Sequence, residues 1–292
     1  MKTEGKTPLR RLTTFRIGGR PMLYVRPHDY AELEAALLVC RARGTAFRVL
    51  GGGSNLLVDD GVLPFAVIHV CSPGFDWIER TGRTTLKVGA GVRLGRLLRY
   101  CEKAGLGGLE FMSGIPGTVG GALAGNAGAW GHSIGERVRR AWLFQEGGAA
   151  ARVSADSMGF GYRSSAMGDV IITEAELRLE RRSPELIARL AHRYTSEKAR
   201  RHPTGTASAG CVFKNPPGQS AGKLLDMCGM KGVRVGGAEV SRMHANFICN
   251  VSGASAEDVL ELIHRMQQAA YEKFNVMLEL EIKRWSPRSR VA

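Results

Sequence analysis

Residues 114–129 read GIPGTVGGALAGNAGA, with the glycines and the proline interleaved with Ile, Val and Leu. A flexible linker would be polar and free of aliphatic residues, so this composition predicts a different structure. Glycine lets main-chain N–H groups approach a ligand closely, and the aliphatic side chains anchor the loop to a core. The stretch therefore predicts backbone that lies against a ligand such as a diphosphate.

A second glycine run points the same way. Residues 51–55 read GGGSN and follow the apolar segment FRVL at 47–50. Either run alone could consist of glycines that only make turns. Two such runs in one chain favour a long dinucleotide that is held at both ends.

A third glycine pattern, GAGVRLG at residues 89–95, lies between an expected strand and an expected helix. Its spacing is G-x-G-x-x-x-G, and the partner strand with an acidic tip that a Rossmann site needs is missing. We interpret this segment as a tight connection between strand and helix.

Composition limits the class of protein. The chain has 292 residues, of which 44% are hydrophobic and 23% are charged. This is enough to bury a sizeable core in two or three domains. No apolar run approaches the ~20 residues of a membrane span, and the first residues do not resemble a signal peptide. We therefore expect a cytoplasmic protein without membrane contact.

The formal net charge of +14 raises the possibility of nucleic-acid binding. However, the basic residues are spread along the chain and no basic tract is interleaved with aromatic residues. We expect a solvated, Arg-rich surface that attracts small anions, and no nucleic-acid partner. The six cysteines and seven histidines show no metal-ligand spacing, so we expect neither a metal site nor disulfides.

Hydrophobic periodicity and end signals predict alternating strands and helices, followed by a separate α+β unit. Asp29, Ser183 and Ser255 are the expected N-caps of three helices. The expected helices cover residues 29–43, 94–103, 183–200, 221–227 and 255–274. The expected strands cover residues 22–26, 47–50, 65–70, 138–145, 150–153, 170–179, 211–213, 245–251 and 277–285, with a hairpin over 77–89 and a disordered tail after Trp285.

Several motifs together resemble one known family, the UDP-N-acetylenolpyruvoylglucosamine reductases, flavoenzymes of bacterial cell-wall assembly. They occur in the order of the family, from about residue 13 to residue 284. The matching segments are TFRIGG (14–19), LGGGSNLLV (50–58), the stretch 114–128, FGYRSS (160–165), AGCVFKNP (209–216), the segment 241–250 around HANF (244–247), and LELE (278–281).

The resemblance implies an α+β protein. Two subdomains form an FAD-binding fold of the vanillyl-alcohol-oxidase-like (PCMH-type) class, and a C-terminal α+β domain binds the substrate. We place the subdomains at residues 1–73 and 74–182, the substrate domain with its connecting helix at 183–285, and a tail at 286–292. The chain resembles the shorter form of the family, which lacks an inserted loop, and we expect a monomer or weak oligomer.

The resemblance also implies noncovalent FAD in the two glycine cradles. The expected FAD-binding residues are Gly51, Gly52, Gly53, Ser54, Asn55, Pro116, Gly117, Thr118, Gly120, Gly121, Asn126 and Ala127. Within them, the Gly120-Gly121 pair is expected to leave room for the ligand. The expected partners are NADPH as co-substrate and a UDP-sugar substrate, for which the candidate binding residues are Tyr162, Lys214 and Asn215. The usual glutamine before Pro203 is His202 here.

Three residues carry the expected chemistry. Hydride addition to an enolpyruvyl ether places negative charge next to the carboxylate, and Arg163 can stabilise it with a permanent cation. The family's proton donor is a serine, and this chain has Cys211 at that position, a stronger acid than an alcohol. Glu281 matches the family's acid, and beside a developing dianion we expect its pKa to be raised. Strand alternation places Glu279 and Glu281 on one face.

The expected function is therefore NADPH-dependent, FAD-mediated reduction of UDP-N-acetylglucosamine enolpyruvate to UDP-N-acetylmuramate. One alternative is an FAD oxidase or dehydrogenase of the same fold that acts on a hydroxy acid or alcohol, which would need a base at the site. The other is a non-catalytic binder of nucleotide-sugars or nucleic acids, which would have no use for two cradles.

Overall fold

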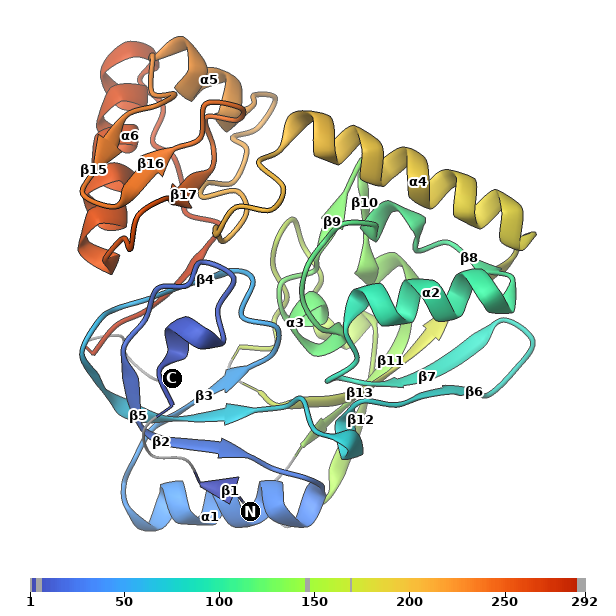
Figure 1. Ribbon diagram of the computed structural model, residues 1–292. Helices are drawn as coiled ribbons and strands as arrows, with labels where there is room; N and C mark the ends of the chain where they lie inside the picture. The colour runs from blue at the N-terminus through green and yellow to red at the C-terminus, as the bar shows by residue number, and fades with distance from the viewer. Residues whose placement is uncertain (1, 4–6, 145–147, 169, 288–292) are drawn as a thin grey trace.

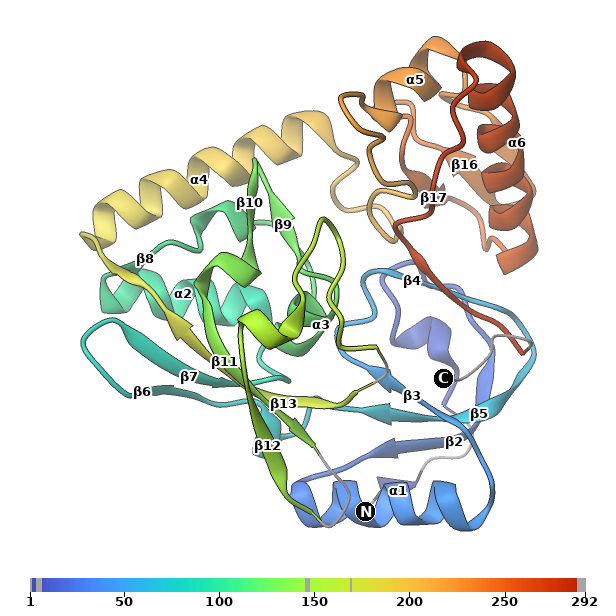
Figure 2. The same cartoon turned by 180° about the vertical axis from the view of Figure 1, so that it is seen from behind.

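The computed structural model describes residues 2–3, 7–144, 148–168 and 170–287. Figures 1 and 2 show a larger body of mixed sheets and helices, with a smaller helical unit above the first sheet. No helix among these residues is long and apolar enough to cross a membrane. The expected strand end at residue 145 and the tail at 288–292 lie outside the described residues.

The first subdomain is built on a four-stranded sheet in the order β1-β2-β5-β3. Strands β2 and β3 both run parallel to β5, and β1 is antiparallel to β2. Asp29 caps α1, because its Oδ1 accepts a hydrogen bond from the Glu32 N–H at 2.9 Å. The elements are β1 (Lys2–Thr3), β2 (Arg20–Arg26), α1 (Tyr30–Ala42), β3 (Phe47–Leu50), β4 (Leu56–Val58) and β5 (Val62–His69).

The second subdomain contains a five-stranded antiparallel sheet in the order β12-β11-β13-β7-β6. The glycine pattern at 89–95 is the tight connection expected from the sequence, since it joins the end of β7 to the start of α2. The main elements are β6 (Ile78–Arg80), β7 (Thr85–Gly89), α2 (Leu94–Ala104), α3 (Val119–Ala124), β11 (Val138–Phe144), β12 (Ala150–Ser154) and β13 (Ile172–Arg178). Two short pairs accompany them: β8 (Leu106–Gly107) with β14 (Glu180–Arg181), and β9 (Gly128–Ala129) with β10 (His132–Ser133).

Helix α4 (Pro184–Arg201) connects this body to the C-terminal unit (Figure 1). Ser183 is its N-cap, as predicted, with Oγ accepting from the Leu186 N–H at 3.3 Å. Along its length α4 packs against α2 and the short 3₁₀ turn at Glu110–Met112. One end of this helix therefore lies on the second subdomain and the other leads into the C-terminal unit.

The C-terminal unit packs two helices and a small antiparallel sheet around a second hydrophobic core, to which Phe15, Ile17 and Leu57 of the first subdomain also contribute. Ser255 and Asp258 form the predicted capping box at the start of α6. The elements are α5 (Ala221–Met227), β15 (Arg234–Val235), β16 (Ala238–Val240), β17 (Ile248–Asn250) and α6 (Ala256–Phe274).

The last strand returns to the first subdomain. Strand β18 (Lys283–Trp285) pairs in parallel with β4, and the Trp285 ring packs edge-on against Phe65 at 6.0 Å. The predicted strand over 277–285 is therefore wrong for its first six residues, which make only an isolated bridge between Leu280 and Phe213. The predicted strand at 211–213 is likewise two isolated bridges.

Candidate active site

A cavity of about 650 Å³ lies where the two subdomains, α4 and the C-terminal unit meet. Both glycine runs line it, together with Arg163, Lys198, Cys211 and Glu281. Its volume is typical of a site that encloses a cofactor or drug-sized ligand. Residues that are far apart in the sequence thus line one cavity.

The two glycine runs form one cradle. A Cβ on Gly52 would lie 2.5 Å from the Gly117 Cα, and one on Gly51 would lie 2.6 Å from the Thr118 Oγ1. Ser54 adds a hydrogen bond from its Oγ to the Pro116 carbonyl at 3.0 Å. Because a side chain at 51 or 52 would push the runs apart, both glycines are needed for this close approach.

The amide groups of the first run remain available to a ligand. Within the described part of the chain, the N–H groups of residues 51–55 donate to no protein acceptor. Gly53 also has φ of +62°, in the left-handed region that glycine favours. A glycine loop with free amide donors beside this cavity fits the diphosphate of a dinucleotide such as FAD.

In the second run, Thr118 and Gly120 have structural contacts of their own. Thr118 is the N-cap of α3, and its Oγ1 accepts a hydrogen bond from the Gly121 N–H at 3.4 Å. A Cβ on Gly120 would lie 2.9 Å from the Ala90 Cβ. Gly120 therefore allows α3 to pack closely on the end of β7, a role that we did not expect beside the predicted one of leaving room for the ligand.

Arg163 lies in a tight turn. Gly161 and Ser164 exchange backbone hydrogen bonds at 3.0 and 3.3 Å, and Arg163 between them has φ of +54°. This conformation is unfavourable for a residue with a side chain, and such strain occurs typically at functional sites. The turn directs the guanidinium toward Glu281, with Nε 2.9 Å from Oε1.

Cys211 and Glu281 are brought together by backbone pairing around Val212. The Glu281 N–H donates to the Val212 carbonyl at 2.8 Å, and the Val212 N–H donates to the Asn246 carbonyl at 2.9 Å. The buried Asn246 side chain then makes two hydrogen bonds to the Phe213 backbone, at 2.9 and 2.8 Å. The family-like segments around 211, 246 and 281 thus form one small ladder at the cavity wall.

Glu279 and Glu281 do not lie as predicted. The Glu279 side chain is 72% exposed and pairs with Lys214 at 2.6 Å, whereas the Glu281 side chain is 19% exposed. The expectation that both face one way is wrong, because residues 277–282 do not form a regular strand and side-chain alternation does not hold there.

Burial perturbs both groups that are expected to donate protons. Burial raises the pKa of Cys211 to about 12, and the nearby Glu281 carboxylate adds to this shift. Burial also raises the pKa of Glu281, although the Arg163 cation acts in the opposite direction. The direction predicted for Glu281 is confirmed. Cys211 is a neutral thiol at ordinary pH, and a weaker acid than its reference pKa suggested.

Lys198 is a cavity residue that the sequence analysis missed. It lies on α4, and its Nζ donates to the Ser113 carbonyl at 3.2 Å, directly before the long glycine stretch. Burial lowers the pKa of Lys198 to about 8, and the neighbouring Arg163 adds to the effect. A lysine on an amphipathic helix usually points to solvent, so no sequence signal distinguished it.

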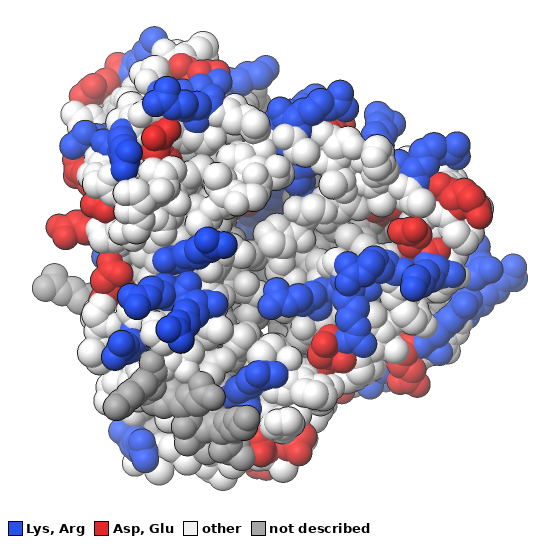
Figure 3. Space-filling model, in the orientation of Figure 1, with Lys and Arg blue, Asp and Glu red and all other residues white. Residues whose placement is uncertain are grey.

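The charges of the cavity wall are mostly positive. Among the described residues, Arg48, Arg163, Lys198 and Lys283 line it, against the one carboxylate of Glu281. Figure 3 shows Lys and Arg side chains around the hollow between the upper unit and the rest of the molecule. Such an arrangement favours anionic ligands. In the described residues no group of three His, Cys, Asp or Glu side chains could hold a metal ion, and all six cysteines are free.

The three candidate substrate residues lie next to one another outside the cavity lining. The Tyr162 side chain is exposed, its ring lies 5.4 Å from the Arg163 guanidinium, and its hydroxyl accepts from the Asn215 N–H at 3.4 Å. The Asn215 Oδ1 accepts from the Ala221 N–H at 3.1 Å, at the start of α5. Lys214 is paired with Glu279, so an incoming ligand would have to compete for its ammonium group.

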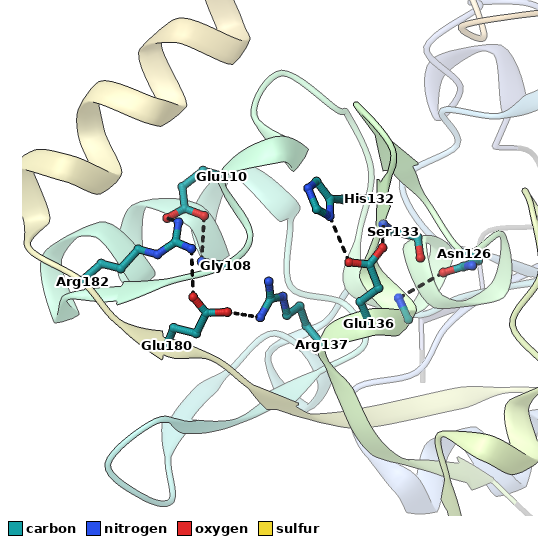
Figure 4. Close-up of polar contacts among 10 residues, drawn as sticks. Gly108, Glu110, Asn126, His132, Ser133, Glu136, Arg137, Glu180 and Arg182 are labelled. Carbon is teal, nitrogen blue, oxygen red and sulfur yellow. Dashed lines mark hydrogen bonds and ion pairs between the residues drawn. The ribbon is translucent and has the colours of Figure 1, made fainter.

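Of the FAD-binding candidates, Asn126 is the one that does not line the cavity. Its Nδ2 donates to the Gly161 carbonyl at 2.8 Å. Its Oδ1 accepts from the Gly135 N–H at 3.0 Å, the contact that is drawn from Asn126 in Figure 4. The other eleven residues, including Ala127, line the cavity. Through its bond to Gly161, Asn126 holds the turn that contains Arg163 against the C-terminal end of the glycine stretch.

Comparison with known proteins agrees with this architecture. A family model described as an FAD binding domain matches residues 21–153, and one described as the C-terminal domain of UDP-N-acetylenolpyruvoylglucosamine reductase matches residues 202–285. The reductase of that name from Syntrophotalea carbinolica is 40% identical over 277 residues, which cover 94% of this chain and 92% of the relative. The one from Pelobacter propionicus is 39% identical over 278 residues, covering 94% and 93%.

A solved structure is similar over nearly the whole chain. The crystal structure of the reductase from Thermus caldophilus matches with a TM-score of 0.85 and 38% sequence identity, covering 98% of this chain and 100% of that one. The α+β architecture, with an FAD-binding part followed by a reductase C-terminal domain, is therefore confirmed.

Proposed function

The chain belongs to the UDP-N-acetylenolpyruvoylglucosamine reductase family, and we propose that it reduces the enolpyruvyl ether of UDP-N-acetylglucosamine enolpyruvate to give UDP-N-acetylmuramate for peptidoglycan synthesis. The cofactor is FAD, and NADPH is the proposed source of the electrons. The observation that carries the proposal is the meeting of Arg163, Cys211 and Glu281 at one cavity that both glycine runs line. We also propose a cytoplasmic location, where the proposed substrates would be available.

We assign FAD to residues 1–182 and the UDP-sugar to residues 183–285. The eleven cavity-lining residues of the two glycine runs are the proposed FAD contacts, with Asn126 in a supporting position. When bound, the flavin supplies a hydride to the vinyl carbon of the substrate. The chain's own residues must then hold the substrate, stabilise the negative charge and deliver a proton to the adjacent carbon.

Arg163 is the proposed charge stabiliser. Its guanidinium is permanently charged and can hold the substrate carboxylate through two parallel hydrogen bonds. Glu281 lies 2.9 Å from it and has a raised pKa. In its protonated form Glu281 can donate a hydrogen bond to the enolate, whereas an ionised carboxylate would repel it.

Cys211 is the proposed proton donor to carbon. Its thiol lines the cavity and stays protonated up to high pH because burial holds its pKa at about 12. The resulting thiolate would be flanked by the cations of Arg163 and Lys198, both of which lower the pKa of this thiol. These cations offset part of the cost of forming a buried anion.

Lys198 is proposed as a contact for an anionic group of the nucleotide substrates, and Tyr162, Lys214 and Asn215 as contacts for the UDP-sugar at the cavity edge. The purified protein should be yellow. Under anaerobic conditions NADPH should bleach the flavin absorbance, and the UDP-sugar enolpyruvyl ether should restore it. Bleaching without such restoration would contradict the assigned substrate, and a protein that stays colourless with added FAD would contradict the whole assignment.

A further inference from the structure

One family-like segment, TFRIGG at 14–19, has no part in the proposed reaction, although Thr14 lines the cavity. Phe15 and Ile17 are 1% and 2% exposed and belong to the core of the C-terminal unit. The Thr13 hydroxyl donates to the Ile17 carbonyl at 3.0 Å, which closes the segment into a tight turn. The segment is therefore anchored in the C-terminal unit and holds Thr14 at the cavity.

Thr14 makes two hydrogen bonds that lead to different parts of the chain. Its N–H donates to the Gly53 carbonyl of the first glycine run at 3.0 Å, and its hydroxyl donates to the Ser208 carbonyl at 2.7 Å. A Cβ on Gly53 would lie 2.1 Å from the Leu12 carbonyl oxygen, so a glycine is needed for this close approach. Thr14 therefore joins the cradle to the chain three residues before Cys211.

The stretch from Ser208 to Cys211 lies along the cavity wall. Isolated backbone bridges hold Ala207 and Cys211 to the C-terminal unit. Between these bridges Gly210 has φ of +83°, and glycine restricts the backbone little. The hydrogen bond from Thr14 thus fixes, relative to the cradle, a stretch of backbone that its glycine leaves adaptable.

Asn55, at the end of the same glycine run, makes a corresponding contact to the other acid. Its Nδ2 donates to the Glu281 carbonyl at 3.1 Å, and its own carbonyl accepts from the Lys283 N–H at 3.0 Å. The first glycine run is thus joined to the segments that carry both proposed acids, Cys211 and Glu281. Both acids are placed relative to the loop that is assigned to FAD.

We infer that Thr14 is a positioning residue for the proposed proton donor: its hydroxyl holds the segment of Cys211 in a fixed place against the FAD cradle. The inference rests on the proposed function, in which a hydride and the proton of Cys211 add to neighbouring carbons of one substrate. The two must be delivered in register, and a displacement of about 1 Å can cost about 10²-fold in rate. Loss of the Thr14 hydroxyl would leave the cradle intact and release the donor.

The first test compares the two half-reactions by stopped-flow absorbance of the flavin. Thr14→Val should slow reoxidation by the UDP-sugar enolpyruvyl ether about tenfold and leave reduction by NADPH within about twofold of wild type, because reduction does not use the Cys211 proton. Thr14→Ser, which keeps the hydroxyl, should recover most of the rate. In a Cys211→Ala background, Thr14→Val should cause no further slowing, because both changes act through one group. Thr81→Val, at an exposed threonine between β6 and β7, is the matched control.

The second test needs no turnover. Iodoacetamide alkylation of the FAD-loaded protein, followed by mass spectrometry of its peptides, measures the reactivity of each free cysteine. Thr14→Val should raise the rate constant for Cys211 about fivefold, because a released segment opens more often. The rate constant for Cys228, at the end of α5 in the same C-terminal unit, should not change.

Unchanged reoxidation together with unchanged alkylation of Cys211 would overturn the inference. An equal slowing of both half-reactions, or a further slowing in the Cys211→Ala background, would overturn it as well. If Thr14→Val does not fold, Thr14→Ala, which removes the same hydroxyl and adds no methyl group, takes its place. A wild-type enzyme that NADPH reduces but the UDP-sugar does not reoxidise would overturn the proposed function, and the alkylation would still decide whether Thr14 places Cys211.

Discussion

Arg163 and Glu281 lie 2.9 Å apart, Nε to Oε1, although one comes from a strained turn of the second subdomain and the other from the segment that leaves the C-terminal unit. The contact joins the two parts of the chain at the cavity. A cation and an acid of raised pKa in contact can stabilise a substrate carboxylate and a developing enolate together.

Replacement of Arg163 tests the charge-stabilising role. We expect Arg163→Ala to lower kcat by about 10²–10³-fold, because one preorganised donor is worth about 3–4 kcal/mol at a developing charge. The flavin absorbance should be unchanged, since Arg163 lies outside the glycine cradle. Arg200→Ala, at an exposed arginine of α4, is the matched control for stopped-flow and steady-state rates. A variant that raised KM and left kcat unchanged would contradict a role of Arg163 in stabilising the transition state.

The pH profile of Glu281→Gln tests the protonated acid. Because burial raises the pKa of Glu281, the active, protonated form persists to higher pH than for an ordinary glutamate, and the rate should fall as the pH rises through that pKa. The glutamine variant cannot ionise, so the rate should no longer fall with rising pH in this range, while kcat drops about tenfold. An unchanged maximal rate in the variant would exclude a catalytic role for Glu281.

Cys211 variants should separate the two half-reactions. Cys211→Ala should slow the reoxidation of the flavin by the UDP-sugar by about 10²–10⁴-fold, the usual contribution of a positioned acid, and leave reduction by NADPH unchanged. Cys211→Ser restores a hydroxyl donor and should recover part of the rate. Stopped-flow absorbance of the flavin measures both steps, and an equal slowing of both would point to a structural role instead.

Titration of Lys198 should make the KM of an anionic substrate depend on pH. Its pKa of about 8 means that its charge is lost as the pH rises through that value, so the KM of an anionic substrate should increase there. In Lys198→Met the KM should be high at all pH values, and in Lys198→Arg, whose side chain remains charged, the increase near pH 8 should disappear. If KM still increased near pH 8 in Lys198→Arg, the pH dependence would belong to another group.

The ion pair between Glu110 and Arg182, within the second subdomain, offers a test of stability. Glu110 is 4% exposed, accepts from the Gly108 N–H at 2.7 Å and pairs with Arg182 at 3.2 Å (Figure 4). Arg182→Ala would leave a buried carboxylate without its cation, which costs about 3–5 kcal/mol. Urea unfolding should show this loss, and Arg182→Met combined with Glu110→Gln should recover most of it. The exposed Arg181→Ala is the control.

Local signals in the sequence predicted the helices well. Asp29, Ser183 and Ser255 cap helices as expected, because a cap depends on residues within one turn. The strands of the C-terminal unit were predicted less well. The segment 277–282 forms no strand despite its alternation, since its hydrogen bonds go to Val212 and Lys214 rather than along a regular ladder.

The site was predictable where the family motifs are continuous in sequence and less so where its parts meet only in space. The glycine runs and the acid-rich end at 278–281 were visible as motifs. The place of Lys198 depends on how α4 packs beside the glycine stretch. The Asn126 side chain joins the turn at 161–164 to Gly135. Such long-range packing leaves no local pattern.

The most direct measurement of the central claim is the stoichiometry of NADPH oxidation with and without the enolpyruvyl ether of UDP-N-acetylglucosamine. The proposed function predicts one NADPH consumed for each UDP-N-acetylmuramate formed, detected by mass spectrometry, and a rate that is lost in Arg163→Ala. NADPH oxidation that proceeds equally without the UDP-sugar, or a UDP-sugar that emerges unchanged, would contradict it.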